Sequence, residues 1–261
     1  MTTNLTPTFR DRAIVAALAV TQLAMALGEA VPLDEVAGSF DQTRLPRSLL
    51  PWLVLTKVAA AAALVLPLPR WLKEWAFAGI LIDHLGAGAS YLLAGAFEAF
   101  GLKMVPPALL LWAAAFLAFR RNTGPLAPEP TLARGAHVAT LALAASMVVA
   151  AAGELLRVQP VMTSMEVVRV PVYVLSILAP AKLLAALALV VPGYPTLRLW
   201  ARAGLAFNFA GALFLYAAEG TVLLPDVPLL LVFGALVAYT QASALGAGVV
   251  VEPRLGGRAT R

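Results

Sequence analysis

Residues 48–68 read SLLPWLVLTKVAAAAALVLPL, a stretch in which Lys57 is the only charged side chain. An α-helix needs about 20 mainly apolar residues to cross the hydrocarbon core of a bilayer, which is about 30 Å thick. Seven further mainly apolar stretches occur, at residues 13–31, 74–94, 105–119, 136–156, 171–191, 199–218 and 228–249. The sequence therefore predicts an all-α integral membrane protein with eight transmembrane helices.

The composition excludes a water-soluble domain and several kinds of chemistry. Of the 261 residues, 61% are apolar and 13% are charged, and the mean hydropathy is +0.86. Soluble domains average about 45–50% apolar and about 25% charged residues. The chain contains no cysteine. A thiol nucleophile, a disulfide relay, a thiolate-bound zinc ion and a cysteine-bound iron–sulfur cluster are therefore excluded.

Lys and Arg residues are unevenly divided between the two sides of the predicted helices. Twelve lie in the two tails and the even-numbered loops: Arg10, Arg12, Arg70, Lys73, Arg120, Arg121, Arg134, Arg198, Arg202, Arg254, Arg258 and Arg261. Five lie in the odd-numbered loops: Arg44, Arg47, Lys103, Arg157 and Arg169. Because cytoplasmic loops carry an excess of Lys and Arg, we expect a multi-pass protein of the cell inner membrane with both termini in the cytoplasm. The net charge of +5 then belongs to the cytoplasmic rim, and no nucleic-acid partner is expected.

An internal repeat divides the chain into two halves. A shift of 125 residues aligns residues 44–95 with residues 169–220 and gives about 20 identities in 52 positions, including Lys57 with Lys182. A polar, proline-rich stretch at residues 121–130 lies between the halves. We therefore expect two four-helix units, at residues 1–125 and 126–261. Because each unit has an even number of spans, the prediction is two tandem parallel four-helix bundles related by a pseudo-twofold axis along the membrane normal.

One motif carries a family resemblance. Lys57 is followed by Pro67 and by the stretch KEWAFAG at residues 73–79, and this pattern resembles the DoxX-like family of small four-helix membrane proteins. Lys182, Pro192 and the stretch WARAG at residues 200–204 resemble a more diverged copy. The resemblance implies a tandem duplication of the family's four-helix unit and an association with redox complexes, such as thiosulfate:quinone oxidoreductases. Dithiol chemistry is not carried over, because this chain has no cysteine.

Polar residues inside the predicted spans of the first unit are the candidate ligand-binding residues. An ionisable group within a span costs roughly 2.5–3.5 kcal/mol on insertion scales and needs a partner or water. At 1.5 Å per residue, Gln22, Lys57, Asp83 and His84 fall near the bilayer midplane. Glu29 and Tyr91 are expected in a second layer nearer the outer face. Lys57 and Asp83 lie on hairpin neighbours, so an ion pair between them is predicted.

The second unit keeps only part of this set. Its counterparts are Glu154, Lys182, Asn208 and Tyr216, while Met147 replaces Gln22 and Phe209 replaces His84. Lys182 has no matched acid at its own depth, and we expect its side chain to extend toward Glu154. The first unit is therefore the chemically richer one. A single histidine near the midplane does not support a bis-histidine haem, and no metal site is predicted.

The sequence leaves the function open between three hypotheses. In the first, the protein binds a lipophilic molecule, with quinone as the leading candidate, and is the membrane subunit of a redox complex whose electron carrier is a separate oxidoreductase subunit. In the second, it is a non-catalytic scaffold or assembly subunit whose buried ions only fix helix register. In the third, it is a cofactor-free membrane enzyme, an isomerase or hydrolase, acting on a lipophilic substrate. No cofactor can be demonstrated from the sequence, and membrane lipid is the one partner common to all three.

Overall fold

The computed structural model describes residues 8–31, 34–126, 132–221 and 226–246. Within these residues, eight helices are long and apolar enough to cross a membrane. Large apolar side chains such as Leu110 and Val149 are more than 70% exposed on the outside of the bundle, where lipid would cover them. The prediction of an all-α membrane protein with eight spans is confirmed.

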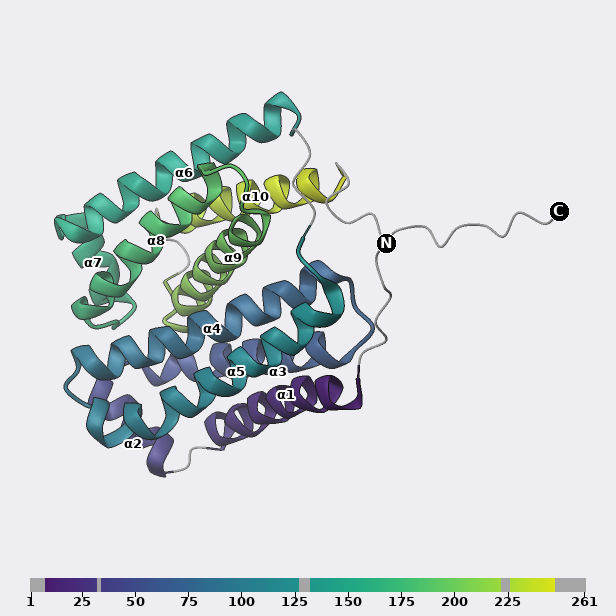
Figure 1. Ribbon diagram of the computed structural model, residues 1–261. Helices are drawn as coiled ribbons and strands as arrows, with labels where there is room; N and C mark the ends of the chain where they lie inside the picture. Colours follow the sequence, from purple (N-terminus) through teal and green to yellow (C-terminus); the bar gives the residue numbers. More distant parts are fainter. Residues whose placement is uncertain (1–7, 32–33, 127–131, 222–225, 247–261) are drawn as a thin grey trace.

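The helices form two rings of four. In the first unit, α1 (Phe9–Ala30) lies beside α3 (Leu50–Val65) and α5 (Leu102–Thr123), and α4 (Arg70–Leu93) completes the ring. In the second unit, α6 (Arg134–Leu155) lies beside α8 (Leu175–Val190) and α10 (Asp226–Ala244), and α9 (Pro195–Ala218) completes it. Figure 1 shows the first unit in purple to teal and the second in green to yellow.

Each ring has its own apolar core, made of the side chains that the helices turn inward. Phe77, which is fully buried, lies in the core of the first unit with Leu18 and Ile80. Met147 and Phe209 lie in the core of the second unit. The two positions that carry polar residues in the first unit, Gln22 and His84, therefore carry core apolar residues in the second.

The two units meet where α4 crosses α9. A Cβ atom at Gly79 would lie 2.8 Å from the ring of Phe207, and a Cβ atom at Gly204 would lie 3.0 Å from Cδ1 of Ile82. Positions 79 and 82 correspond to 204 and 207 in the repeat, so each unit gives the same pair of contacts to the other. Such a reciprocal contact is the signature of a twofold interface. It agrees with the predicted parallel pseudo-twofold arrangement.

Two short helices were not expected from the sequence. Helix α2 (Asp34–Thr43) follows α1, and α7 (Gln159–Val167) occupies the equivalent place after α6. Arg44 and Arg169 end these helices with left-handed φ values of 56° and 54°. Both helices lie at the end of the molecule opposite to the start of α4 (Figure 1).

The helix boundaries differ from the predicted ones most clearly at α5. The predicted span was residues 105–119, but α5 runs from Leu102 to Thr123, carries Pro106 and Pro107 inside and is preceded by the π-helical turn η2 (Phe97–Gly101). The 3₁₀ turns η1 (Arg47–Leu49) and η3 (Val172–Val174) precede α3 and α8. Residues 247–249 of the last predicted span lie outside the described residues, and so do residues 127–130 of the predicted boundary stretch 121–130.

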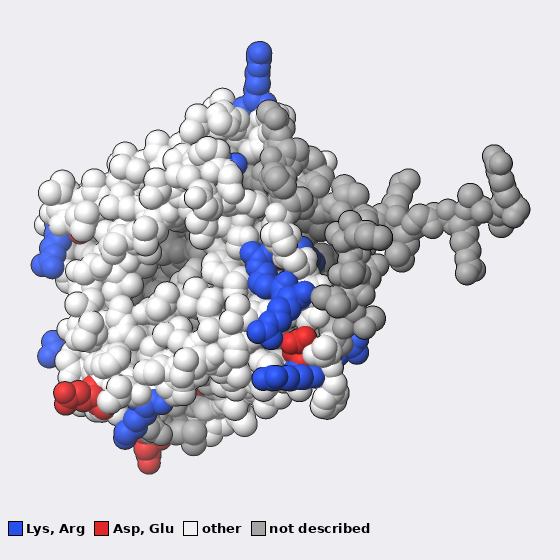
Figure 2. All heavy atoms as spheres, viewed as in Figure 1, with Lys and Arg blue, Asp and Glu red and all other residues white. Residues whose placement is uncertain are grey.

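Charged residues lie mainly at the two ends of the helices. Figure 2 shows Lys and Arg gathered at the end where α4 starts and α5 stops, with a broad uncharged surface beside it. We call this end, which carries Arg70, Arg120, Arg121 and Arg198, the basic end. An uncharged belt bounded by charged ends is the surface that a bilayer requires.

Candidate functional site

A buried cluster of three charged side chains lies in the first unit. Nζ of Lys57 is 2.8 Å from Oε1 of Glu29 and 3.2 Å from Oδ2 of Asp83. The exposed fraction of the side chain is 5% for Lys57, 12% for Glu29 and 26% for Asp83. We call these three residues the Lys57 cluster. With two carboxylates and one ammonium group, it joins helices α1, α3 and α4.

Glu29 makes a contact that the sequence analysis did not predict. The sequence placed Glu29 in a layer nearer the outer face, and in the structure its carboxylate contacts Lys57 directly. Glu29 lies in the last turn of α1, and α1 packs along α3. The long side chain of Lys57 spans the difference in depth between the two Cα atoms. The predicted contact of Lys57 with Asp83 is present as well.

Gln22 and His84 are buried in the same unit and carry unsatisfied polar atoms. Their exposed fractions are 1% and 3%. Nδ1 of His84 lies 2.6 Å from the carbonyl oxygen of Ile80 one turn earlier in α4. Nε2 of His84, Nε2 of Gln22 and Oε2 of Glu29 are buried without a hydrogen-bond partner. Such atoms cost free energy unless a ligand or water satisfies them.

The two tyrosines do not join these groups. The ring of Tyr91 stacks on Phe100, with 6.1 Å between the ring centroids. The hydroxyl of Tyr216 donates to Oδ2 of Asp226 over 2.8 Å, and the same carboxylate oxygen accepts from Ser164 of α7. Tyr216 therefore ties the end of α9 to α7 and to the start of α10. The expected layer of a glutamate and a tyrosine shared by both units is not a contact layer.

The second unit holds a simpler ion pair. Nζ of Lys182 contacts Oε1 of Glu154, as the sequence suggested, and Oε2 of Glu154 is buried without a hydrogen-bond partner. Asn208, the counterpart of Asp83, is half-buried. This pair has one carboxylate where the Lys57 cluster has two.

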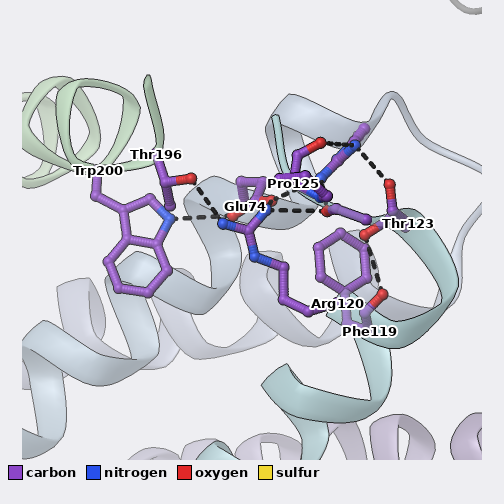
Figure 3. A network of polar contacts seen from close by, with 9 residues as sticks. Glu74, Phe119, Arg120, Thr123, Pro125, Thr196 and Trp200 are labelled. Carbon is purple, nitrogen blue, oxygen red and sulfur yellow. Dashed lines mark hydrogen bonds and ion pairs between the residues drawn. The ribbon is translucent and has the colours of Figure 1, made fainter. Parts of the chain in front are cut away.

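A second polar network, which the sequence analysis did not select, joins the two units at the basic end (Figure 3). Glu74 of α4 is completely buried, and its Oε1 lies 3.2 Å from Nη1 of Arg120 and 3.6 Å from Nη2 of Arg70. The indole Nε1 of Trp200 in α9 donates to Oε2 of Glu74 over 3.1 Å. Arg120 also donates to the hydroxyl of Thr196 in α9 over 2.6 Å. Both oxygens of Glu74 therefore have partners on the two sides of the seam, as we call the contact between the units where α4 crosses α9: Oε1 in the first unit and Oε2 in the second.

Signals for this network were present in the sequence. Glu74 belongs to the KEWAFAG stretch, and its counterpart in the second unit is Leu199. A charged residue that replaces an apolar one in a repeat indicates an asymmetric role. The same signal applies to Arg202, the counterpart of Phe77, which was counted as a loop charge but is 1% exposed within α9.

The site can hold a polar ligand group more readily than a metal ion. Within the part of the chain that the structure describes, no group of three or more His, Asp or Glu side chains is arranged to bind a metal. The unsatisfied polar atoms of the first unit offer one amide donor, a carboxylate acceptor and an imidazole nitrogen. These are the groups that bind a carbonyl or hydroxyl group in an apolar surrounding.

Comparison with known proteins identifies the family. The DoxX-like family matches the chain twice, at residues 13–119 and 138–240, and these two matches fall on the two four-helix units. No curated protein and no solved structure matches the chain. The matched residues make up most of the sequence, so the chain belongs to the DoxX-like family and carries the family's unit twice.

Proposed function

We propose that the protein binds a lipophilic, quinone-like molecule in its first unit and serves as the membrane subunit of a redox complex. The observation that carries this proposal is the group of three buried, unsatisfied polar atoms on Gln22, Glu29 and His84. In the second unit, Met147 and Phe209 fill two of the equivalent positions. A ligand with a polar head and an apolar body would satisfy these atoms, and the bilayer is its source.

The chemistry of the three atoms suits a quinone and its reduced form. When Nδ1 of His84 donates to the carbonyl of Ile80, Nε2 of the neutral ring is an acceptor. His84 would then accept a hydrogen bond or a proton from a quinol hydroxyl, and Gln22 would donate to the ring oxygen. Reduction of a quinone takes two electrons and two protons. For reduction, the electrons would come from an oxidoreductase partner and the protons from water; in the reverse step, the oxidation of a bound quinol, Nε2 of His84 and the carboxylate of Asp83 would accept the two protons.

The orientation of the protein is part of the same proposal. The basic end carries most of the Lys and Arg residues near the helix ends. By the positive-inside rule, this end would lie in the cytoplasm of a bacterial-type inner membrane, with both termini on that side. Glu29, in the last turn of α1, would then lie in the outer half of the bilayer.

Transplanting the residues of the second unit into the first tests the proposal. The double variant Gln22→Met and His84→Phe removes two of the unsatisfied atoms and keeps the apolar volume that the second unit tolerates. The probe is decylubiquinone, whose bound amount is measured by mass spectrometry after the protein is reconstituted in lipid nanodiscs. Two hydrogen bonds worth about 0.5–1.5 kcal/mol each predict a loss of about fivefold to 150-fold in affinity.

The matched control is Lys182→Met, which removes the buried cation of the second unit and should leave quinone binding unchanged. Wild-type protein that binds no more decylubiquinone than empty nanodiscs would overturn the proposal. The same holds if the double variant folds and binds the probe as tightly as the wild type.

The scaffold hypothesis has its own supporting observation. The Glu74 network joins the two units and leaves no oxygen of Glu74 unsatisfied, as expected of a purely structural device. If the first unit binds no lipophilic ligand, this network and the Lys57 cluster remain as elements that hold the two units in register. Product formation by the purified chain alone would instead favour a cofactor-free enzyme.

A further inference from the structure

The seam between the two units is filled on one side and open on the other. On one side, Trp52 of α3 packs against α9: a Cβ atom at Gly211 would lie 3.0 Å from Nε1 of Trp52. The ring of Trp52 also lies 5.8 Å from the ring of Phe214. Gly86 of α4 is the counterpart of Gly211, and a Cβ atom at Gly86 would have no heavy atom within 4 Å.

The cause of this difference is visible in the repeat. Ile177 of α8 stands where the repeat places Trp52, and Ala89 of α4 stands where it places Phe214. Two large aromatic side chains on the filled side are thus replaced by smaller aliphatic ones on the other. The two sides of the seam are built from corresponding elements: η3 and α8 contact α4, while η1 contacts α9 and the side chain of Trp52 in α3 packs against it. The missing side-chain volume therefore leaves a space beside Gly86.

The open space lies next to the Lys57 cluster. Gly86 follows Asp83 by three residues, so the two lie on adjacent parts of one helix face. Asp83 is the most exposed member of the cluster, at 26% of its side chain. Its neighbours on α4, Ile82 and Leu85, are 45% and 51% exposed. Oδ2 of Asp83 contacts Lys57, and the exposed part of the carboxylate borders an apolar space, where a ligand hydroxyl group could donate a hydrogen bond to it.

At the end of α4 opposite to the basic end, α8 is held against the first unit. The hydroxyl of Tyr173, in the turn before α8, donates to the carbonyl oxygen of Thr43 over 2.8 Å. Ser90, one turn beyond Gly86 in α4, is buried and lies close to the same hydroxyl. This contact closes the space at that end and leaves the side of the molecule as the direction from which a ligand would come.

We propose that the space beside Gly86, between α4 and α8, is the lateral entry and binding site for the apolar body of a lipid-soluble ligand whose polar head reaches Asp83. The inference rests on the proposed function for the nature of the head group. It adds the position of the apolar body, the route from the bilayer and the stoichiometry. Of the two sides of the seam formed by the described residues, Trp52 fills one and the other is open, so one chain binds one ligand although it contains two units.

Filling the space with the packing that the chain already uses on the other side tests the proposal. The double variant Ala89→Phe and Ile177→Trp recreates the pair formed by Trp52 and Phe214. The single variant Gly86→Leu is the alternative if the double variant does not fold, and thermal unfolding checks the fold of each. The matched control, Leu85→Phe with Leu184→Trp, adds the same residue types to exposed positions of the same two helices.

Two probes separate the inference from the proposed function. The first is decylubiquinone in nanodiscs, for which we expect at least a tenfold loss of binding in the filled variants and none in the control. The second is an aryl trifluoromethyl diazirine without a quinone head, which partitions into the bilayer and inserts into nearby residues on illumination. We expect it to label the peptides around Gly86 and Ile177 in the wild type and to lose this labelling in the filled variants.

Each outcome decides one of the two claims. Folded filled variants that bind decylubiquinone like the wild type overturn the inference and leave the proposed function standing. Wild-type protein that binds no quinone but is labelled beside Gly86 overturns the proposed function and supports the space as a site for another apolar ligand. Absence of diazirine labelling beside Gly86 in the wild type overturns the inference, whatever the quinone result.

Discussion

Replacement of Lys57 by methionine gives the sharpest test of the energetics of the buried cluster. Methionine has nearly the length of lysine and carries no charge, so the change removes the cation and keeps most of the packing. Two carboxylates, Glu29 and Asp83, then face each other without the ammonium group that lies 2.8 Å and 3.2 Å from them. Because Lys57 is 5% exposed, water cannot take its place without opening the bundle.

The size of the effect follows from this geometry. Removing one partner of a buried ion pair costs about 3–5 kcal/mol, because the other charge stays buried and unpaired. For a chain of this size, 1 kcal/mol shifts the melting temperature by roughly 2–4 °C. We therefore expect Lys57→Met to lower the melting temperature by about 10 °C. The measurement is thermal unfolding in a mild detergent, followed by intrinsic tryptophan fluorescence.

Two further variants separate charge from packing. The triple variant Lys57→Met, Glu29→Gln and Asp83→Asn removes all three charges, and it should recover most of the lost stability, since a neutral replacement of a buried ion cluster is often harmless. Lys182→Met leaves one unpaired carboxylate and should cost less than Lys57→Met. At about 2–4 °C per kcal/mol, a shift of less than about 2 °C corresponds to a loss of less than about 1 kcal/mol. The reasoning is refuted if the melting temperature of Lys57→Met differs from that of the wild type by less than this, or if the triple variant is no more stable than Lys57→Met.

Three other predictions follow from contacts across the seam and at the helix ends. Gly79→Ala would place a methyl group 2.8 Å from the ring of Phe207 and should destabilise the protein by about 1–3 kcal/mol. Gly86→Ala meets open space and should stabilise α4 by up to about 1 kcal/mol. Equal melting temperatures for the two variants would contradict this prediction. Glu74→Leu, which copies the second unit, should lower the free energy of unfolding by about 1–3 kcal/mol because Trp200 and Arg120 lose their acceptor. Glu74→Gln should lower it by less. As a second readout, the chain between the two units, residues 124–133, should be cleaved faster by protease in Glu74→Leu than in the wild type. Tyr216→Phe should cost about 1 kcal/mol through its lost hydrogen bond to Asp226, while Tyr91→Phe keeps the ring contact with Phe100 and should unfold like the wild type.

The architecture could be predicted from the sequence because membrane helices are recognised by length and composition alone. The repeat then fixed the parallel arrangement of the two units, and the reciprocal contacts of Gly79 and Gly204 agree with it. Helices α2 and α7 could not be found by this criterion. They have 10 and 9 residues, which is too short to span a bilayer, and they mix polar and apolar residues without a long apolar run.

Two ion pairs were predicted, Lys57 with Asp83 at similar depth and Lys182 with Glu154 through the reach of the lysine side chain. The contact of Lys57 with Glu29 was missed, because the same reach was not applied to Lys57 once Asp83 had been assigned as its partner. The Glu74 network was missed for another reason. Charges near helix ends are expected to be solvated, and only the placement of α9 against α4 shows that Trp200 and Thr196 meet Glu74 and Arg120.

The tandem arrangement of the two units has a consequence for how the seam evolves and assembles. In a homodimer, every substitution appears on both sides of the twofold axis, so filling one side with Trp52 would fill the other as well. Covalent linkage removes this constraint and allows one half to be optimised for packing while the other stays open. It also makes pairing of the halves an intramolecular event whose strength does not depend on the amount of protein in the membrane. A chain cut in the linker and expressed as two halves should therefore pair only above a threshold concentration, while the intact chain pairs at any expression level.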